Sequence, residues 1–176
     1  MSKFEVLSAL PPYGEMYVPI TPDGTSFYSE GLPVRFHRYD GTSWVGNFRP
    51  GFGSLNLVHE FRNSPNLLIV SGGQCYLIDP DTEVVVLVFG GSYEKGIQTA
   101  DGRLVMHDLT GLTIVEGNAN YWHTQDIAID GIRNLSINGA IISGSAYLGS
   151  TAGNDWNEFN YNMDTKELTY HKNTQT

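Results

Sequence analysis

The stretch IVSGGQCYL, residues 69–77, returns one residue shorter as IISGSAYL, residues 141–148. About half-way between the two copies, residues 103–108 follow the same course of turn, apolar run and polar end. Self-similarity at a fixed period is the mark of a repeated supersecondary unit. The spacing predicts a unit of roughly 36 residues, in which strands flank a glycine-containing turn.

Short apolar runs and turn signals alternate along most of the remaining chain. Asp-Gly or Asn-Gly pairs, which favour tight hairpin turns, occur at residues 40–41, 101–102, 130–131 and 138–139. Past Phe61 no segment keeps a helical period for three turns, whereas residues 55–61 and residues 5–10 could each form one short helix. The runs group into units of about four strands over residues 55–89, 96–127 and 134–171. A fourth unit would have to come from residues 13–48.

These patterns predict an all-β protein made of antiparallel four-stranded repeat units. A small propeller-like ring and a two-sheet sandwich fit the strands equally well. The length of 176 residues suits a single domain over 1–176. Five of the eight prolines precede residue 34, so we expect a proline-rich irregular lead-in over 1–38. A β-repeat body over 39–171 and a tail over 172–176 complete the predicted organisation.

Turns of one kind separate several of the expected strands. A strand, an Asp-x-x-Thr or Asp-Thr turn and a further strand occur around residues 79–82 and 164–165. This arrangement resembles the inner turns of WD40- and YVTN-like β-propeller blades over residues 55–171. Residues 126–166 are also similar to a module of an uncharacterised bacterial β-rich protein family. The resemblances imply a propeller-like fold and a bacterial lineage, and they imply no activity.

The charge balance limits the classes of partner. A formal charge of -9 argues against nucleic acid and against an anionic membrane surface, and it favours a basic protein or a cation. The single Cys75 excludes an internal disulfide framework. We expect a cytoplasmic protein, because no signal peptide or membrane-spanning apolar run is visible in the sequence.

No catalytic or cofactor motif is present in the sequence. The five histidines show no paired spacing of the kind that zinc sites use, so we predict no metal and no cofactor. Asp79 and Asp81 fit a turn better than a carboxylate pair that divides acid and base work. Cys75 takes the place of Ala146 in the other copy, which favours a small apolar role over a nucleophile. The sequence therefore leans away from an enzyme.

The parts of the chain that do not repeat hold the candidate binding residues, which are Trp122, His123, Asp126, Asp130, Asp155 and Trp156. We expect a non-catalytic acidic protein-interaction protein, of the inhibitor or immunity kind, that binds a basic partner. The alternative is a small-molecule or glycan-binding, or hydrolysing, β-protein with a pocket near His123, Asp126 and Asp130. A structural subunit whose strand edges pair with another copy is a third hypothesis.

Overall fold

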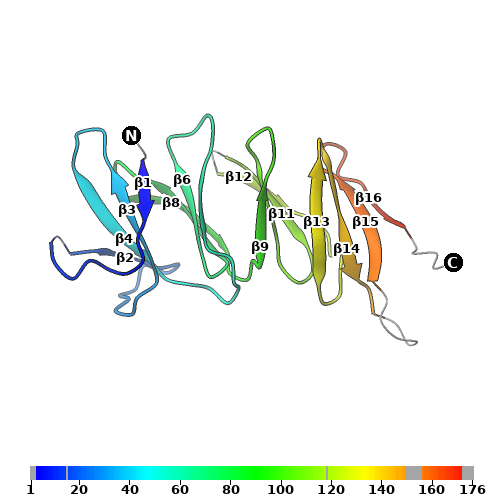
Figure 1. Cartoon of the computed structure of the whole chain (residues 1–176), viewed down its shortest axis with the longest axis horizontal. Helices are drawn as coiled ribbons and strands as arrows, with labels where there is room; N and C mark the ends of the chain where they lie inside the picture. Colours follow the sequence, from blue (N-terminus) through cyan, green and yellow to red (C-terminus); the bar gives the residue numbers. More distant parts are fainter. Residues whose placement is uncertain (1–2, 15, 118, 150–155, 172–176) are drawn as a thin grey trace. The chain divides into compact units, whose positions relative to one another are not determined.

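The computed structural model describes residues 3–14, 16–117, 119–149 and 156–171, and Figure 1 traces them. The described residues form sixteen strands and no helix. Their contacts divide the chain into two compact units: residues 1–94 with 117–119, and residues 95–116 with 120–176. We call these unit 1 and unit 2. The expected all-β class is confirmed, and the single-domain organisation stays a prediction.

Unit 1 contains two four-stranded sheets. The first has the order β1 (Phe4–Val6), β3 (Leu32–His37), β4 (Ser43–Phe48) and β2 (Val18–Ile20). The second has the order β5 (Leu57–Glu60), β6 (Leu67–Ser71), β7 (Gln74–Asp79) and β8 (Val84–Gly90). The resolved pairs are antiparallel, except that β2 runs parallel to β4.

The lead-in over 1–38 is not irregular throughout, because β1, β2 and β3 lie in it. Residues 4–6 form a strand and not the first turn of a helix, since Phe4 and Val6 pair with Phe36 and Val34 of β3. A fourth four-stranded unit thus exists, but it spans residues 4–48 and not the expected 13–48. The turn of its β3–β4 hairpin is closed by Asp40, whose Oδ1 accepts the Thr42 backbone N–H at 2.9 Å.

The core of unit 1 follows from the alternation of side chains along paired strands. Phe36 of β3 stacks on Trp44 of β4 with ring centroids 4.5 Å apart. The same face of this sheet packs against the second sheet. The buried residues of this cluster are Ile20, Val34, Phe36, Trp44, Phe48, Leu67, Ile69, Tyr76 and Ile78.

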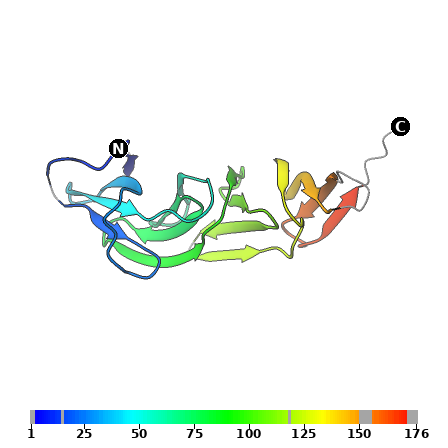
Figure 2. The ribbon, with the colours of Figure 1, turned by 90° about the horizontal axis from the view of Figure 1, so that it is seen from below.

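Unit 2 also contains two four-stranded sheets, which Figures 1 and 2 show from two directions. One has the order β12 (Asn120–His123), β11 (Leu112–Gly117), β10 (Leu104–His107) and β9 (Lys95–Gln98). The other has the order β13 (Ile132–Asn138), β14 (Ile141–Tyr147), β15 (Trp156–Asn162) and β16 (Leu168–His171). The second strands of the last three sheets begin at residues 67, 104 and 141, which confirms repeated four-stranded units.

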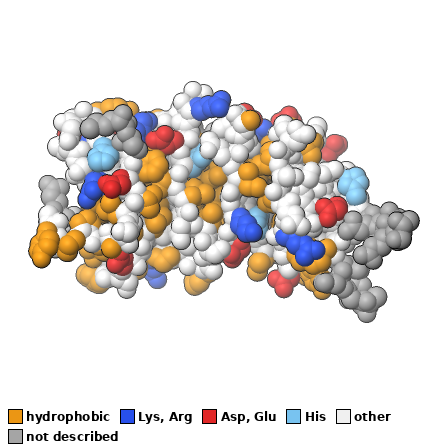
Figure 3. Space-filling view, viewed as in Figure 1, with side chains coloured by type: hydrophobic (Ala, Val, Ile, Leu, Met, Phe, Trp, Pro, Cys, Tyr) orange, Lys and Arg blue, Asp and Glu red, His pale blue; other side chains and the backbone are white. Residues whose placement is uncertain are grey.

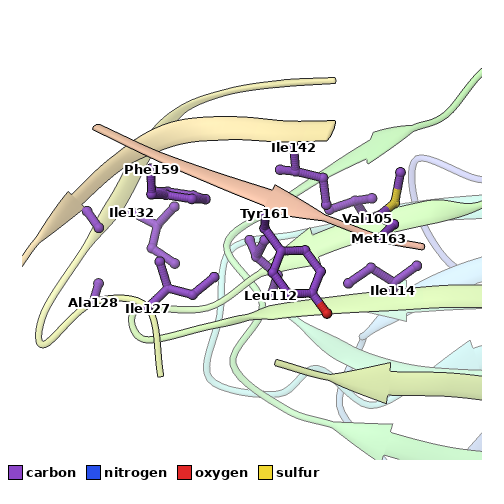
Figure 4. Close-up of a cluster of buried hydrophobic side chains, with 11 residues drawn as sticks. Val105, Leu112, Ile114, Ile127, Ala128, Ile132, Ile142, Phe159, Tyr161 and Met163 are labelled. Carbon is purple, nitrogen blue, oxygen red and sulfur yellow. The ribbon is translucent and has the colours of Figure 1, made fainter. Parts of the chain in front are cut away.

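The two sheets of unit 2 pack face to face around a shared apolar core, drawn in Figure 4. The buried members are Val105, Leu112, Ile114, Ile127, Ala128, Ile132, Ile142, Ala146, Phe159, Tyr161 and Met163. Paired sheets of this kind are the sandwich alternative. The described strands of neither unit close into a barrel or a propeller ring.

The repeated phrase does not mark equivalent places in the fold. In the first copy Gly72 and Gly73, with φ of 51° and 77°, form the turn between β6 and β7. The second copy lies almost wholly inside the single strand β14, where Gly144 is a buried mid-strand residue. The sequence match aligns Ile69 with Ile141. In the fold, the residue that corresponds to Ile141 is Leu67, because each of these two begins the second strand of its sheet, so the sequence match is shifted by two residues. The match of Cys75 with Ala146 is therefore wrong, since Cys75 lies in a third strand.

Candidate functional site

A polar turn connects β10 to β11 in unit 2. Asp108 begins it, and its carboxylate Oδ1 accepts the backbone N–H groups of Thr110 and Gly111, both at 2.8 Å. The Thr110 hydroxyl lies 3.3 Å from the same oxygen. Short polar side chains commonly close turns in this way. The Asp108 carboxylate thus fixes the conformation of residues 108–111.

The loop 124–131, between β12 and β13, is bonded to this turn through the main chain. Ile127 and Ala128 donate their N–H groups to the Thr110 carbonyl at 2.7 and 3.0 Å. Gly131 donates its N–H to the Leu109 carbonyl at 2.8 Å. From the other side, the Thr124 hydroxyl accepts the buried Leu112 N–H at 3.0 Å. The Thr124 N–H donates in turn to the Leu112 carbonyl at 2.9 Å, so five hydrogen bonds hold these two segments side by side.

The turn and the loop together present apolar and acidic side chains to solvent. Leu109 is 52% exposed and Ile129 is 65% exposed. Asp126 and Asp130 are exposed on the same loop, and Asp108 is half-buried at the head of the turn. We call these five residues the acidic edge. Among the described residues, no lysine or arginine forms an ion pair with any of its carboxylates.

His123 adjoins this edge. A Cβ added to Gly111 would lie 2.8 Å from His123 Nε2, so the imidazole lies directly against the turn. Its Nδ1 lies 2.7 Å from the hydroxyl of Thr113. The neighbouring Trp122 turns to the core, as strand alternation predicts. Its indole N–H donates to the Tyr161 hydroxyl at 3.2 Å, and the Lys166 ammonium lies 5.0 Å from its ring centroid.

Trp156, the first residue of β15, also lies beside the edge. A Cβ added to Gly131, next to Asp130, would be 3.2 Å from its indole ring. The Arg133 guanidinium lies 3.8 Å from the centroid of the same ring, and Tyr147 packs against it at 5.7 Å. Such a cation–π contact holds the arginine over the ring. Asp155 lies outside the described residues.

The structure thus brings His123, Asp126, Asp130 and Trp156 to one edge of unit 2, and it places Trp122 in the core packing. Sequence reasoning missed Asp108, Leu109 and Ile129. The Asp-x-Thr spacing at residues 108–110 is a signal that could have located the turn. No local signal places the turn beside loop 124–131, because their hydrogen bonds join residues far apart in sequence.

Other candidate groups belong to turns or to the core. Asp79 Oδ1 accepts the Asp81 N–H at 2.9 Å, which is the turn role expected of it. Burial raises the pKa of the Cys75 thiol, and this side chain is 0% exposed. Within the described ranges, no three His, Cys, Asp or Glu side chains gather as a metal site would require. No helix in the described part of the chain is long and apolar enough to span a membrane.

Comparison with known proteins gives little similarity. No family model matches the sequence, and no curated protein matches it significantly. One similar solved structure is the extracellular domain of a putative one component system from B. thetaiotaomicron. It shares 12% identity with this chain at a TM-score of 0.47, over 89% of this chain and 25% of that chain. This chain therefore spans a quarter of that chain's length, and a similarity this low carries no argument about function. The resemblances to propeller blades and to a bacterial family stay predictions.

Proposed function

We propose that this chain is a non-catalytic binding protein whose acidic edge docks a basic segment of another protein. The observation that carries the proposal is the pairing of two exposed apolar side chains, Leu109 and Ile129, with three carboxylates on hydrogen-bonded segments. An apolar centre within a charged rim is the usual anatomy of a protein interface. The proposal includes an inhibitor or immunity role in the cytoplasm.

The negative charge of the stretch around the acidic edge favours a basic partner. The sequence has no lysine or arginine between residues 104 and 132, although four carboxylates lie there. This stretch therefore presents acidic and apolar side chains without a basic one. On the face drawn in Figure 3, acidic and basic side chains are scattered among uncharged and apolar groups. Complementary charge accelerates encounter with a basic partner and selects against acidic ones. Burial of the two apolar side chains then stabilises the complex.

Two contacts favour binding over catalysis and over glycan recognition. Thr113 is the hydroxyl beside the His123 ring, but it is 0% exposed, so a substrate cannot reach it as a nucleophile. Arg133 covers one face of the Trp156 indole at 3.8 Å. A sugar stacked on that face would first have to displace the guanidinium. The pocket alternative near His123, Asp126 and Asp130 is therefore the less favoured proposal.

Affinity capture with matched charge variants tests the proposal. One variant carries Asp126→Lys and Asp130→Lys, and the control carries Glu60→Lys and Glu167→Lys, which change the net charge equally at exposed sites outside residues 104–132. When each form is immobilised and mixed with cell extract at low ionic strength, the wild type and the control should retain the same basic protein in stoichiometric amount. The edge variant should lose it, and added salt should release it, because salt screens exposed charges. Equal retention by all three forms, or none by any, would contradict the proposal.

A further inference from the structure

A hollow of about 450 Å³ lies at the opposite strand ends of unit 2 from the acidic edge. The turn 99–103 between β9 and β10, the turn 139–140 between β13 and β14, and Asp164 after β15 line it. Strands alternate in direction, so these turns and those of the acidic edge fall at different ends of the sheets. The hollow is thus separate from the site described above, and its volume is in the range of small-ligand pockets.

Arg103 is the central polar group of the hollow. Only 16% of its side chain is exposed. Its guanidinium bonds Asp101 twice, from Nη2 to Oδ2 at 2.8 Å and from Nε to Oδ1 at 3.3 Å. The Thr99 hydroxyl donates to the same carboxylate. The hydrogen bonds from Arg103 and then Thr99 lower the pKa of Asp101 to about 2, so Asp101 is ionised and committed to the arginine at neutral pH.

Asp164 is the carboxylate that Arg103 does not satisfy. Its Oδ1 lies 3.8 Å from Arg103 Nη1, which is beyond hydrogen-bond distance, and 69% of its side chain is exposed. The hollow therefore contains two carboxylates and one guanidinium, with the guanidinium already paired. An anionic ligand would have to displace Asp101, whereas a cationic ligand finds a carboxylate open to it. The electrostatic preference is for a cation.

The apolar residues that line the hollow indicate what the uncharged part of the ligand should be. The apolar residues Ile97, Ile137 and Ala140 line the hollow beside the charged groups. An apolar stem against these residues, with a charged end at Asp164, satisfies both parts of the wall. We propose that this hollow binds an alkylammonium group, an apolar chain of a few carbons that ends in a primary amine. A free amine and a lysine side chain share this chemistry.

Titration of the isotope-labelled protein with n-butylamine at neutral pH, followed by NMR of the backbone amides, tests the inference. The amides of residues 97–101 and 137–140 should shift with saturation. 1-Butanol, which has the same chain without the charge, should bind at least about threefold more weakly, as expected for one partly exposed ion pair. The same titration with a lysine blocked at both its amino and carboxyl ends shows whether a lysine side chain of a protein binds in the hollow as free butylamine does.

Two matched variants measure what the Asp164 carboxylate contributes to binding. Asp164→Asn should weaken butylamine binding by about threefold or more, whereas Glu167→Gln, in the same turn but outside the lining, should leave it unchanged. Unaltered strand amide shifts would show that both variants are folded. Equal binding of butanol and butylamine, equal affinity in both variants, or stronger binding of acetate would overturn the inference. Capture of a basic protein at the acidic edge is independent of each of these results.

Discussion

The most informative perturbation is the replacement of Asp108, because two substitutions separate its hydrogen bonds from its charge. Asp108→Asn keeps an acceptor oxygen at the head of the turn, whereas Asp108→Ala removes it. The native oxygen accepts two backbone N–H groups at 2.8 Å. Loss of a side chain that caps backbone donors in this way costs about 1–2 kcal/mol at a helix start, and the turn geometry is comparable. The asparagine should cost less than about 0.5 kcal/mol.

Amide hydrogen exchange measures the local loss of stability that each Asp108 substitution causes. Ile127, Ala128 and Gly131 donate to carbonyls of residues 109 and 110, so their amides report whether the turn stays in place. In Asp108→Ala their exchange should accelerate about 5- to 30-fold, which is the equivalent of 1–2 kcal/mol, and in Asp108→Asn about twofold or less. Amides of β6 in unit 1 serve as the control. Equal acceleration in both variants would refute the reasoning, because charge and not the acceptor would then hold the turn.

Three further outcomes are expected from single groups. The pKa of Asp101 is lowered from 3.8 to about 2, so its contribution to stability is complete above pH 3.8 and is lost as the pH falls towards 2. Urea unfolding of Asp101→Asn should accordingly lose less stability over that interval than wild type, and an unchanged pH profile would contradict this. Thr124→Val leaves the buried Leu112 N–H without its hydroxyl acceptor, and urea denaturation should show a loss of about 1–3 kcal/mol, whereas Thr124→Ser should lose less. Cys75 should resist thiol reagents in the native state and react fully in denaturant, since its side chain is 0% exposed; rapid native labelling would show that sheet β5–β8 is misplaced.

Local signals were sufficient to predict most of the sheets. Hairpin turns such as Asp40-Gly41 and Asn138-Gly139 require φ values that glycine readily adopts, and both glycines have positive φ, 85° and 59°. Strand β1 was missed because its three residues gain their conformation by pairing with β3, about thirty positions along the chain. The alignment of the repeated phrase was wrong by two residues. Side chains alternate between the two faces of a strand, so a shift of two residues still matches apolar positions with apolar positions.

The candidate site was predictable only in part for the same physical reason. His123, Asp126 and Asp130 stood out as polar residues outside the repeat, and they lie at one edge of unit 2. Leu109 did not stand out, because an apolar residue in a turn is recognised as exposed only from the fold. Its position follows from the Gly131 N–H that bonds its carbonyl at 2.8 Å. Contacts between distant segments carry no signature in a single sequence.

Mapping of a basic peptide onto the backbone amides tests the proposed function most directly. The probe is an acetylated Lys-Leu-Lys-Lys-Leu-Lys peptide, with a glutamate-for-lysine peptide as the control, at low ionic strength. Shifts should concentrate at residues 108–111 and 124–131, disappear in the Asp126→Lys, Asp130→Lys variant, and be absent with the acidic peptide. Shifts spread evenly over both units, or an undiminished response in that variant, would contradict the assignment of the acidic edge as the docking site.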